Sequence, residues 1–300
     1  MKKIFAYGLL LMVTLAWGVS FVSSKIVLNV IDPISLGFVR YLFAFGFLLI
    51  FFFAKKETIV IQKRDIFRLM VSAIIGVALY FYAENTAVSY ISASTASILV
   101  STLPIFLILT NFILFRERIS RIKMIAVAGS ILGVGFVVGG DIDQLTWESI
   151  QGYLFMLLAV GAWIVFSHTT MELRKRYSNL KIITLQAGIT LLVLAPFAMT
   201  AIGPILSMPP VMWGHIAFLG IVCSGLAFYW YVYAMKQIGT VMSSVFINLI
   251  PVVTVITGAI VLQEQLHQMQ ILGGVLIIGA VMFLVWDDMR HLRQAKETFQ

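Results

Sequence analysis

Glu84 is an acidic residue in a hydrophobic part of this 300-residue chain, where a charged side chain needs an explanation. It follows a run of aromatic residues at positions 80–82, inside a long hydrophobic segment. A carboxylate exposed to lipid costs several kcal/mol, so Glu84 should face protein or a water-filled cavity. There it would pair with the amine of a ligand or exchange a proton with water. The competing interpretation is a structural position at the outer interface, where Glu84 is hydrated or bonded to Asn85.

Two hydrophobic segments carry a tryptophan followed by hydroxyl groups at helical spacing. Trp17 and Ser20 would share one helix face, and Trp163 and Ser167 would share another. Such faces suit a cavity that holds an amphipathic molecule by ring contacts and hydrogen bonds. Ordinary packing, or an aromatic belt at the membrane interface, would also account for them.

His168 follows Ser167 directly and would titrate near neutral pH if it were unperturbed. It is a candidate for proton coupling together with Glu84. A structural histidine, hydrogen-bonded to a neighbouring helix near the cytoplasmic end of its segment, is the competing interpretation.

Asn248 lies three residues before Pro251, and Pro104 occupies a matching place earlier in the chain. Asn248 is a candidate to hydrogen-bond a ligand or a carbonyl freed by the proline. Proline removes one backbone hydrogen bond and kinks a helix, which makes Pro104 and Pro251 hinge candidates. A static bend is equally favoured, because a kink does not by itself imply motion.

The elements that must position these residues are hydrophobic segments long enough to cross a bilayer. The chain is 61% hydrophobic and only 11% charged, with a mean hydropathy of +1.01. Soluble domains carry roughly 25% charged residues, so the composition predicts an integral membrane protein. A span needs about 20 apolar residues. Ten segments fit, near residues 4–24, 33–54, 66–90, 92–115, 121–140, 151–171, 182–203, 211–235, 238–262 and 268–286.

The second five segments read as a diverged copy of the first five. Shifting the sequence against itself by 147 positions pairs Pro104 with Pro251 and Glu117 with Glu264. Trp17 pairs with Trp163 at a shift of 146, so short insertions separate the segments. A repeated proline and glutamate in one register are hard to obtain by chance between apolar helices. The repeat predicts two five-helix domains, residues 1–144 and 145–288, followed by a tail over residues 289–300.

Comparison of the two halves adds candidate ligand-binding residues and shows one difference between the halves. The counterpart of Glu84 is Tyr231, so any acid chemistry would belong to the first half alone. Tyr80 and Tyr231 both belong to aromatic clusters at matching places, and we add both to the ligand-binding candidates.

Orientation follows from lysine and arginine, which stay on the cytoplasmic side of short loops. These residues concentrate at the amino terminus and in the second, fourth and sixth loops, and the intervening loops are acidic or almost uncharged. Lys25 and Arg40 are exceptions, which we interpret as long side chains reaching the outer interface. The pattern predicts cytoplasmic termini and an inverted second repeat, because five helices cross an odd number of times. The inward set is Lys2, Lys3, Lys55, Lys56, Lys63, Arg64, Arg68, Arg116, Arg118, Arg121, Lys123, Arg174, Lys175, Arg176 and Lys181.

In its motifs and their order the whole chain resembles the drug/metabolite transporter superfamily, in particular its EamA-type members. The resemblance rests on Ala16-Trp17-Gly18, on Pro33 with the Phe38 to Tyr41 run, on the two Pro-to-Glu stretches, and on the glycine-rich fifth and tenth segments. It implies ten helices in a five-plus-five arrangement. It also implies a carrier of small organic solutes with a central cavity lined by spans one, three, four, six, eight and nine.

We therefore expect a secondary active transporter in the plasma or inner membrane, working by alternating access. An amino acid or related compound is the favoured substrate and export the favoured direction, the latter from the resemblance alone. A lipophilic or cationic drug is the rival substrate, with Glu84 and the tryptophans as its site. A passive channel, a membrane-embedded enzyme and a non-transporting partner protein are competing hypotheses from different functional classes.

The sequence implies no cofactor, no metal site and no nucleic-acid partner. Its single cysteine excludes a cysteine metal cluster, and no nucleotide-binding loop of the Gly-x-x-x-x-Gly-Lys type is present. The expected partners are a small-molecule substrate, the bilayer and protons, with a monomer or weak homodimer as the assembly.

Overall fold

The computed structural model describes residues 2–115, 121–139, 146–238, 243 and 246–297, and this part of the chain contains helices but no strand. Glu117 lies outside the described residues. The helices are α1 (Lys2–Leu28), α2 (Pro33–Ala54), α3 (Lys63–Ala73), η1 (Ile74–Leu79), α4 (Tyr80–Tyr90), α5 (Ala93–Val100), α6 (Leu103–Phe115), α7 (Arg121–Gly139), α8 (Trp147–Leu173), α9 (Asn179–Ala198), η3 (Met199–Ala201), α10 (Ile202–Leu206), α11 (Pro210–Ala217), η4 (Phe218–Leu226), α12 (Ala227–Ile238), α14 (Ile250–Thr257), η5 (Gly258–Leu262) and α15 (Gln268–Glu297).

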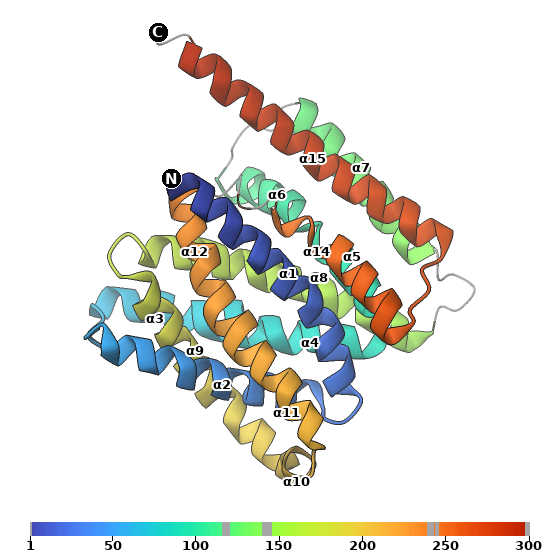
Figure 1. Ribbon diagram of the computed structural model, residues 1–300. Helices are drawn as coiled ribbons and strands as arrows, with labels where there is room; N and C mark the ends of the chain where they lie inside the picture. Colours follow the sequence, from blue (N-terminus) through green and yellow to red (C-terminus); the bar gives the residue numbers. More distant parts are fainter. Residues whose placement is uncertain (1, 116–120, 140–145, 239–242, 244–245, 298–300) are drawn as a thin grey trace.

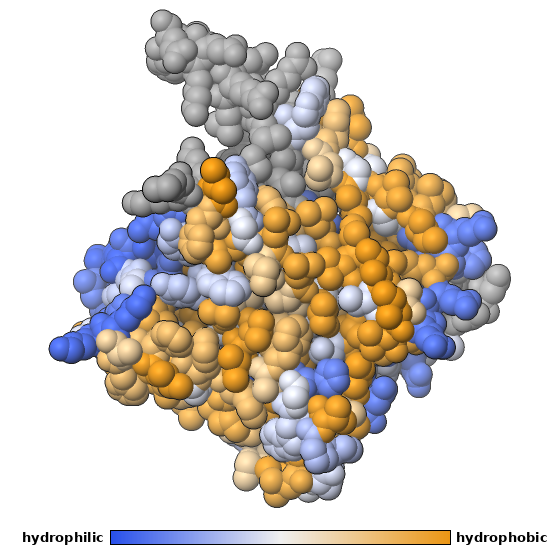
Figure 2. Space-filling view, viewed as in Figure 1, coloured by the Kyte–Doolittle hydropathy of each residue, from blue (hydrophilic) through white to orange (hydrophobic). Residues whose placement is uncertain are grey.

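Each of the ten predicted segments is mostly helical over its described residues. Hydrophobic residues cover the middle of the face shown in Figure 2, and hydrophilic residues gather at its left and right edges. This is the surface of a protein embedded in a bilayer. Within the described residues six stretches are long and apolar enough to cross it: Ile4–Leu28, Pro33–Ala54, Lys63–Tyr90, Trp147–Leu173, Asn179–Leu206 and Pro210–Ile238.

The helices pack in a pattern that follows the repeat. Helix α1 packs on α12, and its counterpart α8 packs on α4. Helices α2 and α9 pack on each other, as do α7 and α15, which form a pair set to one side of the bundle (Figure 1). The beginning of α1 and the end of α15 lie toward the same end of the bundle (Figure 1).

Two spans are broken near their middles instead of kinked, which corrects our expectation for the prolines. Helix α5 ends at Val100 and α6 begins at Leu103, so Pro104 sits in the first turn of a new helix. Pro251 likewise sits in the first turn of α14. Proline is well tolerated there because the first amides of a helix have no internal partner. Both breaks lie beside the central cavity described below, as in the discontinuous helices of transporters.

Matching π-helical turns interrupt two other spans. Turn η1 precedes Tyr80, and η4 precedes Ala227. A π turn releases carbonyls from the helical ladder, and Cys223 of η4 offers its carbonyl to the Trp17 indole at 3.0 Å.

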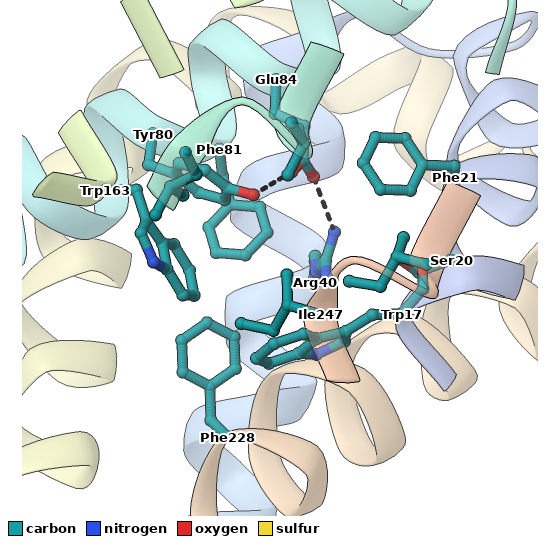
Figure 3. Close-up of a pocket in the computed structure, with 13 residues that line it drawn as sticks. Trp17, Ser20, Phe21, Arg40, Tyr80, Phe81, Glu84, Trp163, Phe228 and Ile247 are labelled. Carbon is teal, nitrogen blue, oxygen red and sulfur yellow. Dashed lines mark hydrogen bonds and ion pairs between the residues drawn. The ribbon is translucent and has the colours of Figure 1, made fainter. Parts of the chain in front are cut away.

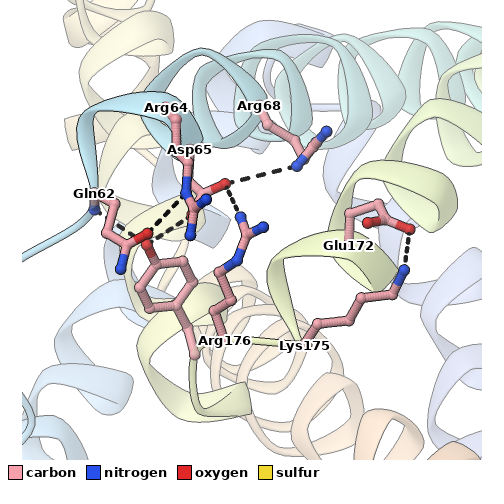
Figure 4. Close-up of polar contacts among 8 residues, drawn as sticks. Gln62, Arg64, Asp65, Arg68, Glu172, Lys175 and Arg176 are labelled. Atoms are coloured by element: carbon pink, nitrogen blue, oxygen red, sulfur yellow. Dashed lines mark hydrogen bonds and ion pairs between the residues drawn. The ribbon is translucent and has the colours of Figure 1, made fainter.

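At one end of the bundle a polar junction joins α3 and the loop before it to the loop between α8 and α9 and to the start of α9. Asp65, 1% exposed, accepts hydrogen bonds from Arg176 at 2.7 Å and from the Tyr177 hydroxyl at 2.9 Å (Figure 4). Arg68 adds an ion pair at 3.6 Å. Lys181 reaches back to the carbonyl of Val60 at 2.6 Å. We call these residues the polar junction.

At the opposite end the corresponding loops meet through apolar side chains. A separate buried cluster joins the end of α1 and the start of α2 to α10, α11 and η4. We call this cluster the apolar junction; its buried members are Val27, Ile31, Leu36, Val39, Ala198, Ile205, Met208, Ile216 and Leu219.

Helices α7 and α15 approach closely because both carry glycine at the crossing. A Cβ built on Gly133 would lie 2.8 Å from the Gly273 carbonyl oxygen, and one on Gly273 would lie 2.5 Å from the Gly133 oxygen. Small residues at such crossings allow backbones to touch.

Gly133→Ala should therefore lower the melting temperature of the purified protein in detergent, because the backbones must separate by overpacking that costs about 1–3 kcal/mol. Gly135→Ala, on the same helix with open space around its Cα, is the matched control and should be neutral or stabilising. Equal effects of the two substitutions on thermal unfolding would contradict the close crossing.

Candidate functional site

A cavity of about 40 Å³ lies at the centre of the bundle (Figure 3). It has room for on the order of three water molecules. Small-molecule sites typically measure about 300–1,000 Å³, so this conformation is contracted around the cavity. The residues that line it are Trp17, Ser20, Phe21, Arg40, Tyr80, Phe81, Glu84, Val100, Leu103, Trp163, Phe228, Ile247 and Ile250.

Glu84 points into this cavity and faces Arg40. The guanidinium Nη1 of Arg40 lies 4.0 Å from the Glu84 Oε1 atom. Arg40 and Glu84 are 2% and 6% exposed, so both charges are removed from water and lipid. Asn85 instead donates to the Pro33 carbonyl at 3.1 Å, which removes the interpretation in which it holds Glu84 at the surface.

Side chains from two elements, α4 and η4, fix the two charges. The Tyr80 hydroxyl donates a hydrogen bond to Glu84 from the preceding turn of α4. Arg40 donates through Nε to the Ser224 hydroxyl of η4 at 2.7 Å. Its guanidinium carbon also lies 4.2 Å from the centre of the Phe81 ring, a cation–π contact. Within the described residues the Nη1 atom of Arg40 has no hydrogen-bond acceptor. One donor of the guanidinium is therefore available to a ligand.

Aromatic rings form the wall opposite the charged pair. The rings of Trp17 and Trp163 meet edge to face at 5.9 Å, and Phe228 lies 5.3 Å from Trp17 and 5.7 Å from Trp163. Tyr80 extends the wall at 5.0 Å from Trp163. The indole nitrogen of Trp17 donates a hydrogen bond to the Cys223 carbonyl, which fixes the orientation of the Trp17 ring in the cavity wall.

Five of the predicted ligand-binding residues line the cavity: Trp17, Ser20, Tyr80, Glu84 and Trp163. Tyr231 lies behind this wall, with its ring 5.3 Å from Trp17. The cavity also receives side chains from every span that the resemblance implicated, and α2 adds Arg40.

Three other candidates lie outside the cavity lining. The Ser167 hydroxyl bonds back to the Trp163 carbonyl at 2.8 Å, which satisfies it within its own helix. His168 is half-buried on α8 and is absent from the lining. Asn248 is fully buried at the break before α14, between the lining residues Ile247 and Ile250.

Asn248 is the most informative of these three. Within the described residues neither its amide nitrogen nor its amide oxygen has a hydrogen-bond partner. An unpaired buried amide costs about 1–3 kcal/mol per group, so this side chain gains if a ligand or a rearranged backbone meets it.

The end of the bundle that carries the apolar junction is closed by two further charges. Lys25, at the end of α1, donates to the carbonyls of Val88, Ser89 and Ile91 at 2.7, 3.1 and 3.0 Å. These carbonyls end α4, where a cation complements the helix dipole. Our interpretation that Arg40 reaches the interface was wrong, because Arg40 is fully buried beside the cavity, whereas Lys25 is half-buried at the end of the bundle.

Glu264 completes this closure from the second repeat. Its carboxylate accepts from the amides of Ala93 and Ser94 at 2.8 and 3.0 Å, and from the Ser94 hydroxyl at 2.6 Å. An anion at the start of α5 complements the opposite end of a helix dipole. The repeated Pro-to-Glu stretch therefore ends, in the second half, in a cap on a helix of the first half.

Glu264→Gln should accelerate hydrogen–deuterium exchange at the start of α5, because an amide offers one acceptor oxygen where the carboxylate offers two. Charge-assisted hydrogen bonds contribute about 1.5–3 kcal/mol, so exchange of residues 93–96 should rise about tenfold or more. Glu148→Gln, an exposed acid in the first turn of α8, is the control. Unchanged exchange in the Glu264 variant would show that the carboxylate does not close this end.

Arg40 is the main residue that sequence reasoning missed. We placed it by its distance from the outer loop, and that distance does not show which way the side chain points. Helix α2 begins at Pro33, so Arg40 lies about 10 Å along the helix, too deep for an easy route to the interface. The depth of Arg40 in its hydrophobic segment could therefore have indicated that its side chain points into the protein.

Long apolar helices around a small cavity lined by opposite charges define a multi-pass membrane protein with a candidate small-molecule site. The sequence profile described as the EamA-like transporter family matches the chain twice, over residues 4–139 and 150–286. An uncharacterized transporter of Archaeoglobus fulgidus is 26% identical over 275 residues, covering 91% of this chain and 94% of its own. The uncharacterized transporter YetK of Bacillus subtilis is 26% identical, with 95% and 88% covered.

A crystal structure of another protein superposes with a TM-score of 0.61 at 18% identity, covering 94% of this chain and 95% of that one. This similarity concerns the fold alone. The chain belongs to the EamA-like transporter family. It is therefore a membrane transporter with a small-molecule substrate, and not an enzyme.

The buried charge pair gives a direct test of the site. Arg40→Met should lower stability by about 3–5 kcal/mol, because it leaves Glu84 buried without its cation. The double substitution Arg40→Met with Glu84→Met should recover most of that loss, since replacing both charges by apolar groups of similar size is often neutral. Thermal unfolding in detergent measures both. A double variant no more stable than the single one would contradict the pairing.

Proposed function

We propose that the protein is a secondary carrier of zwitterionic amino acids. The observation that carries this proposal is the facing pair of Arg40 and Glu84 in a cavity walled by aromatic rings. An amino acid carries a carboxylate and an ammonium group on one carbon. Arg40 would bind the carboxylate and Glu84 would bind the ammonium group, so that one ligand pairs with both buried charges.

Binding of this kind separates the two side chains while keeping each charge paired. The 4.0 Å gap between them is too short to admit a ligand, so Arg40 and Glu84 must move apart as it enters. Arg40 would use its unpartnered Nη1 donor, and Glu84 would exchange part of its contact with Tyr80 for the ammonium group. An apolar or aromatic substrate side chain would then lie against Trp17, Trp163 and Phe228.

The contracted cavity and the broken spans support alternating access as the proposed mechanism. The cavity must expand to hold an amino acid, and the breaks before Pro104 and Pro251 let each half-helix move without breaking a continuous ladder. The caps by Lys25 and Glu264 close the outer end in this conformation and would release when the carrier faces outward. Export is the proposed direction, from the family resemblance alone.

Glu84 is also the proposed proton-coupling acid. Protonation would remove its attraction for an ammonium group and leave Arg40 to hold the carboxylate alone, which favours release of a zwitterion. His168 has no access to the cavity lining in this conformation, so a role for it would have to come from another state.

The proposed topology has ten crossings, cytoplasmic termini and two inverted domains, residues 1–144 and 145–288. The two separate profile matches support this division. The packing of α1 on α12 and of α8 on α4 also supports it, because an axis relating the repeats exchanges these pairs. The polar junction collects arginines and lysines of the second and sixth loops, as expected of a cytoplasmic end.

A cationic drug is the weaker proposal. The aromatic wall would suit such a ligand, but Arg40 cancels the charge of Glu84 and would repel it. Transport measurements separate the two ligand classes.

The experiment is counterflow of a labelled amino-acid panel in proteoliposomes, with and without a pH gradient. The unlabelled substrate should compete, whereas its N-acetyl and carboxamide derivatives should each compete about tenfold less well or worse, since each lacks one charged contact worth about 1.5–3 kcal/mol. Glu84→Gln should weaken exchange and remove its response to the gradient. Glu148→Gln is the control.

The competitors also identify which part of the proposal fails. Equal competition by the carboxamide would point to a cationic ligand, and equal competition by the N-acetyl derivative to an anionic one. Normal transport by Glu84→Gln at every pH would remove the carboxylate from the mechanism. No exchange of any amino acid would direct the search to other metabolites.

A further inference from the structure

A second hollow lies near the polar junction, between the ends of α2, α8 and α12 and the start of α9. It measures about 660 Å³, far more than the central cavity. Four basic side chains line it, Lys55, Arg174, Lys175 and Lys236, against the single acid Glu57. We call this hollow the basic vestibule.

Two of these cations are held by other residues. Lys175 pairs with Glu172 at 2.6 Å, and Arg174 donates to Asn179 and to the Val232 carbonyl at 3.0 and 3.2 Å. The acid Glu57 accepts from Ser178 at 2.5 Å.

Lys55 and Lys236 remain. Both are exposed, and within the described residues neither is paired with an acid. Lys55 lies against Tyr229, with 3.3 Å between its ammonium nitrogen and the phenol oxygen. The vestibule thus presents two unpaired cations and a phenol.

An apolar groove of about 210 Å³ continues from the basic vestibule. The two hollows are contiguous because Lys55, Leu180 and Tyr229 line both. Phe51, which is 44% exposed, opens the groove to the surface of α2. The remaining lining residues are Phe47, Leu48, Gly225, Leu226 and Trp230.

The groove exists because α2 and the η4–α12 helix diverge toward this end. At Gly220 the two backbones touch, since a Cβ there would lie 2.6 Å from the Arg40 carbonyl oxygen. At Gly225 the Phe47 ring already lies between them, and at Tyr229 the ammonium group of Lys55, just past the end of α2, makes contact. The wedge between the helices widens toward the vestibule.

We propose that this wedge binds one anionic phospholipid. The phosphate would lie between Lys55 and Lys236 and accept from the Tyr229 hydroxyl, and one acyl chain would fill the groove beside Phe47 and Trp230. Basic pockets between membrane helices near the bilayer surface recognise anionic headgroups. A soluble anion would leave the groove empty, and a zwitterionic lipid such as phosphatidylcholine would bring its own cation next to the two ammonium groups.

The site bears on transport through α12. Tyr229 and Trp230 of the groove follow Phe228 of the central cavity on the same helix. A bound lipid would hold α12 away from α2 at this end, and so bias the position of the cavity wall.

Tryptophan quenching tests the proposal. The purified full chain is reconstituted in phosphatidylcholine vesicles that contain about a tenth of either brominated phosphatidylglycerol or brominated phosphatidylcholine, bromine on an acyl chain being a contact quencher of indole. We expect stronger quenching by phosphatidylglycerol, with the excess lost in Trp230→Phe. Lys55→Gln with Lys236→Gln should weaken the phosphatidylglycerol preference about tenfold or more.

The control is Lys56→Gln with Lys63→Gln, two exposed lysines that do not line either hollow. It should keep the preference. Equal quenching by both brominated lipids, or a preference unchanged in the Lys55 and Lys236 variant, would overturn the proposal. Loss of the excess quenching on adding glycerol phosphate at a concentration equal to the lipid would indicate a soluble-anion site instead.

Discussion

The attraction between Arg40 and Glu84 is the interaction on which the rest of the structure depends. Either charge alone would be too costly inside a membrane protein, and together they require hydrogen-bonding partners held in fixed positions around them. Gly220 meets that requirement by letting η4 touch α2, which brings Ser224 to the guanidinium. The π-helical turns then present the aromatic residues that follow them to the cavity. A polar centre is thus built from elements that are otherwise apolar.

The broken spans also place polar groups beside the central cavity. Irregular backbone is tolerated at membrane depth only where protein or a water-filled cavity surrounds it. The breaks before α6 and α14 lie beside the central cavity, and Asn248 at the second break keeps an unsatisfied amide there. Backbone and side-chain polarity are thus concentrated where a solute would pass, and the lipid-facing surface stays apolar (Figure 2).

Hydrophobic segments fixed the positions of the helices in our predictions, because a span must be long and apolar whatever it packs against. The pairing of Trp17 with Trp163 in the repeat placed both at the cavity, since related residues approach a common axis. The helix breaks, the π turns and the inward turn of Arg40 were not predicted. Each of these features removes a backbone group or a charge from water. That cost is offset only by a tertiary partner, such as Ser224 or the Cys223 carbonyl.

The polar junction and the apolar junction lie at opposite ends of the bundle and are stabilised by different kinds of interaction, although their elements correspond in the sequence repeat. The polar junction around Asp65 is held by ion pairs that dissolved salt can screen. The apolar junction is held by aliphatic side chains, whose association weakens on cooling and is nearly insensitive to salt. The two junctions can therefore be loosened separately, the polar junction by raising the ionic strength and the apolar junction by cooling.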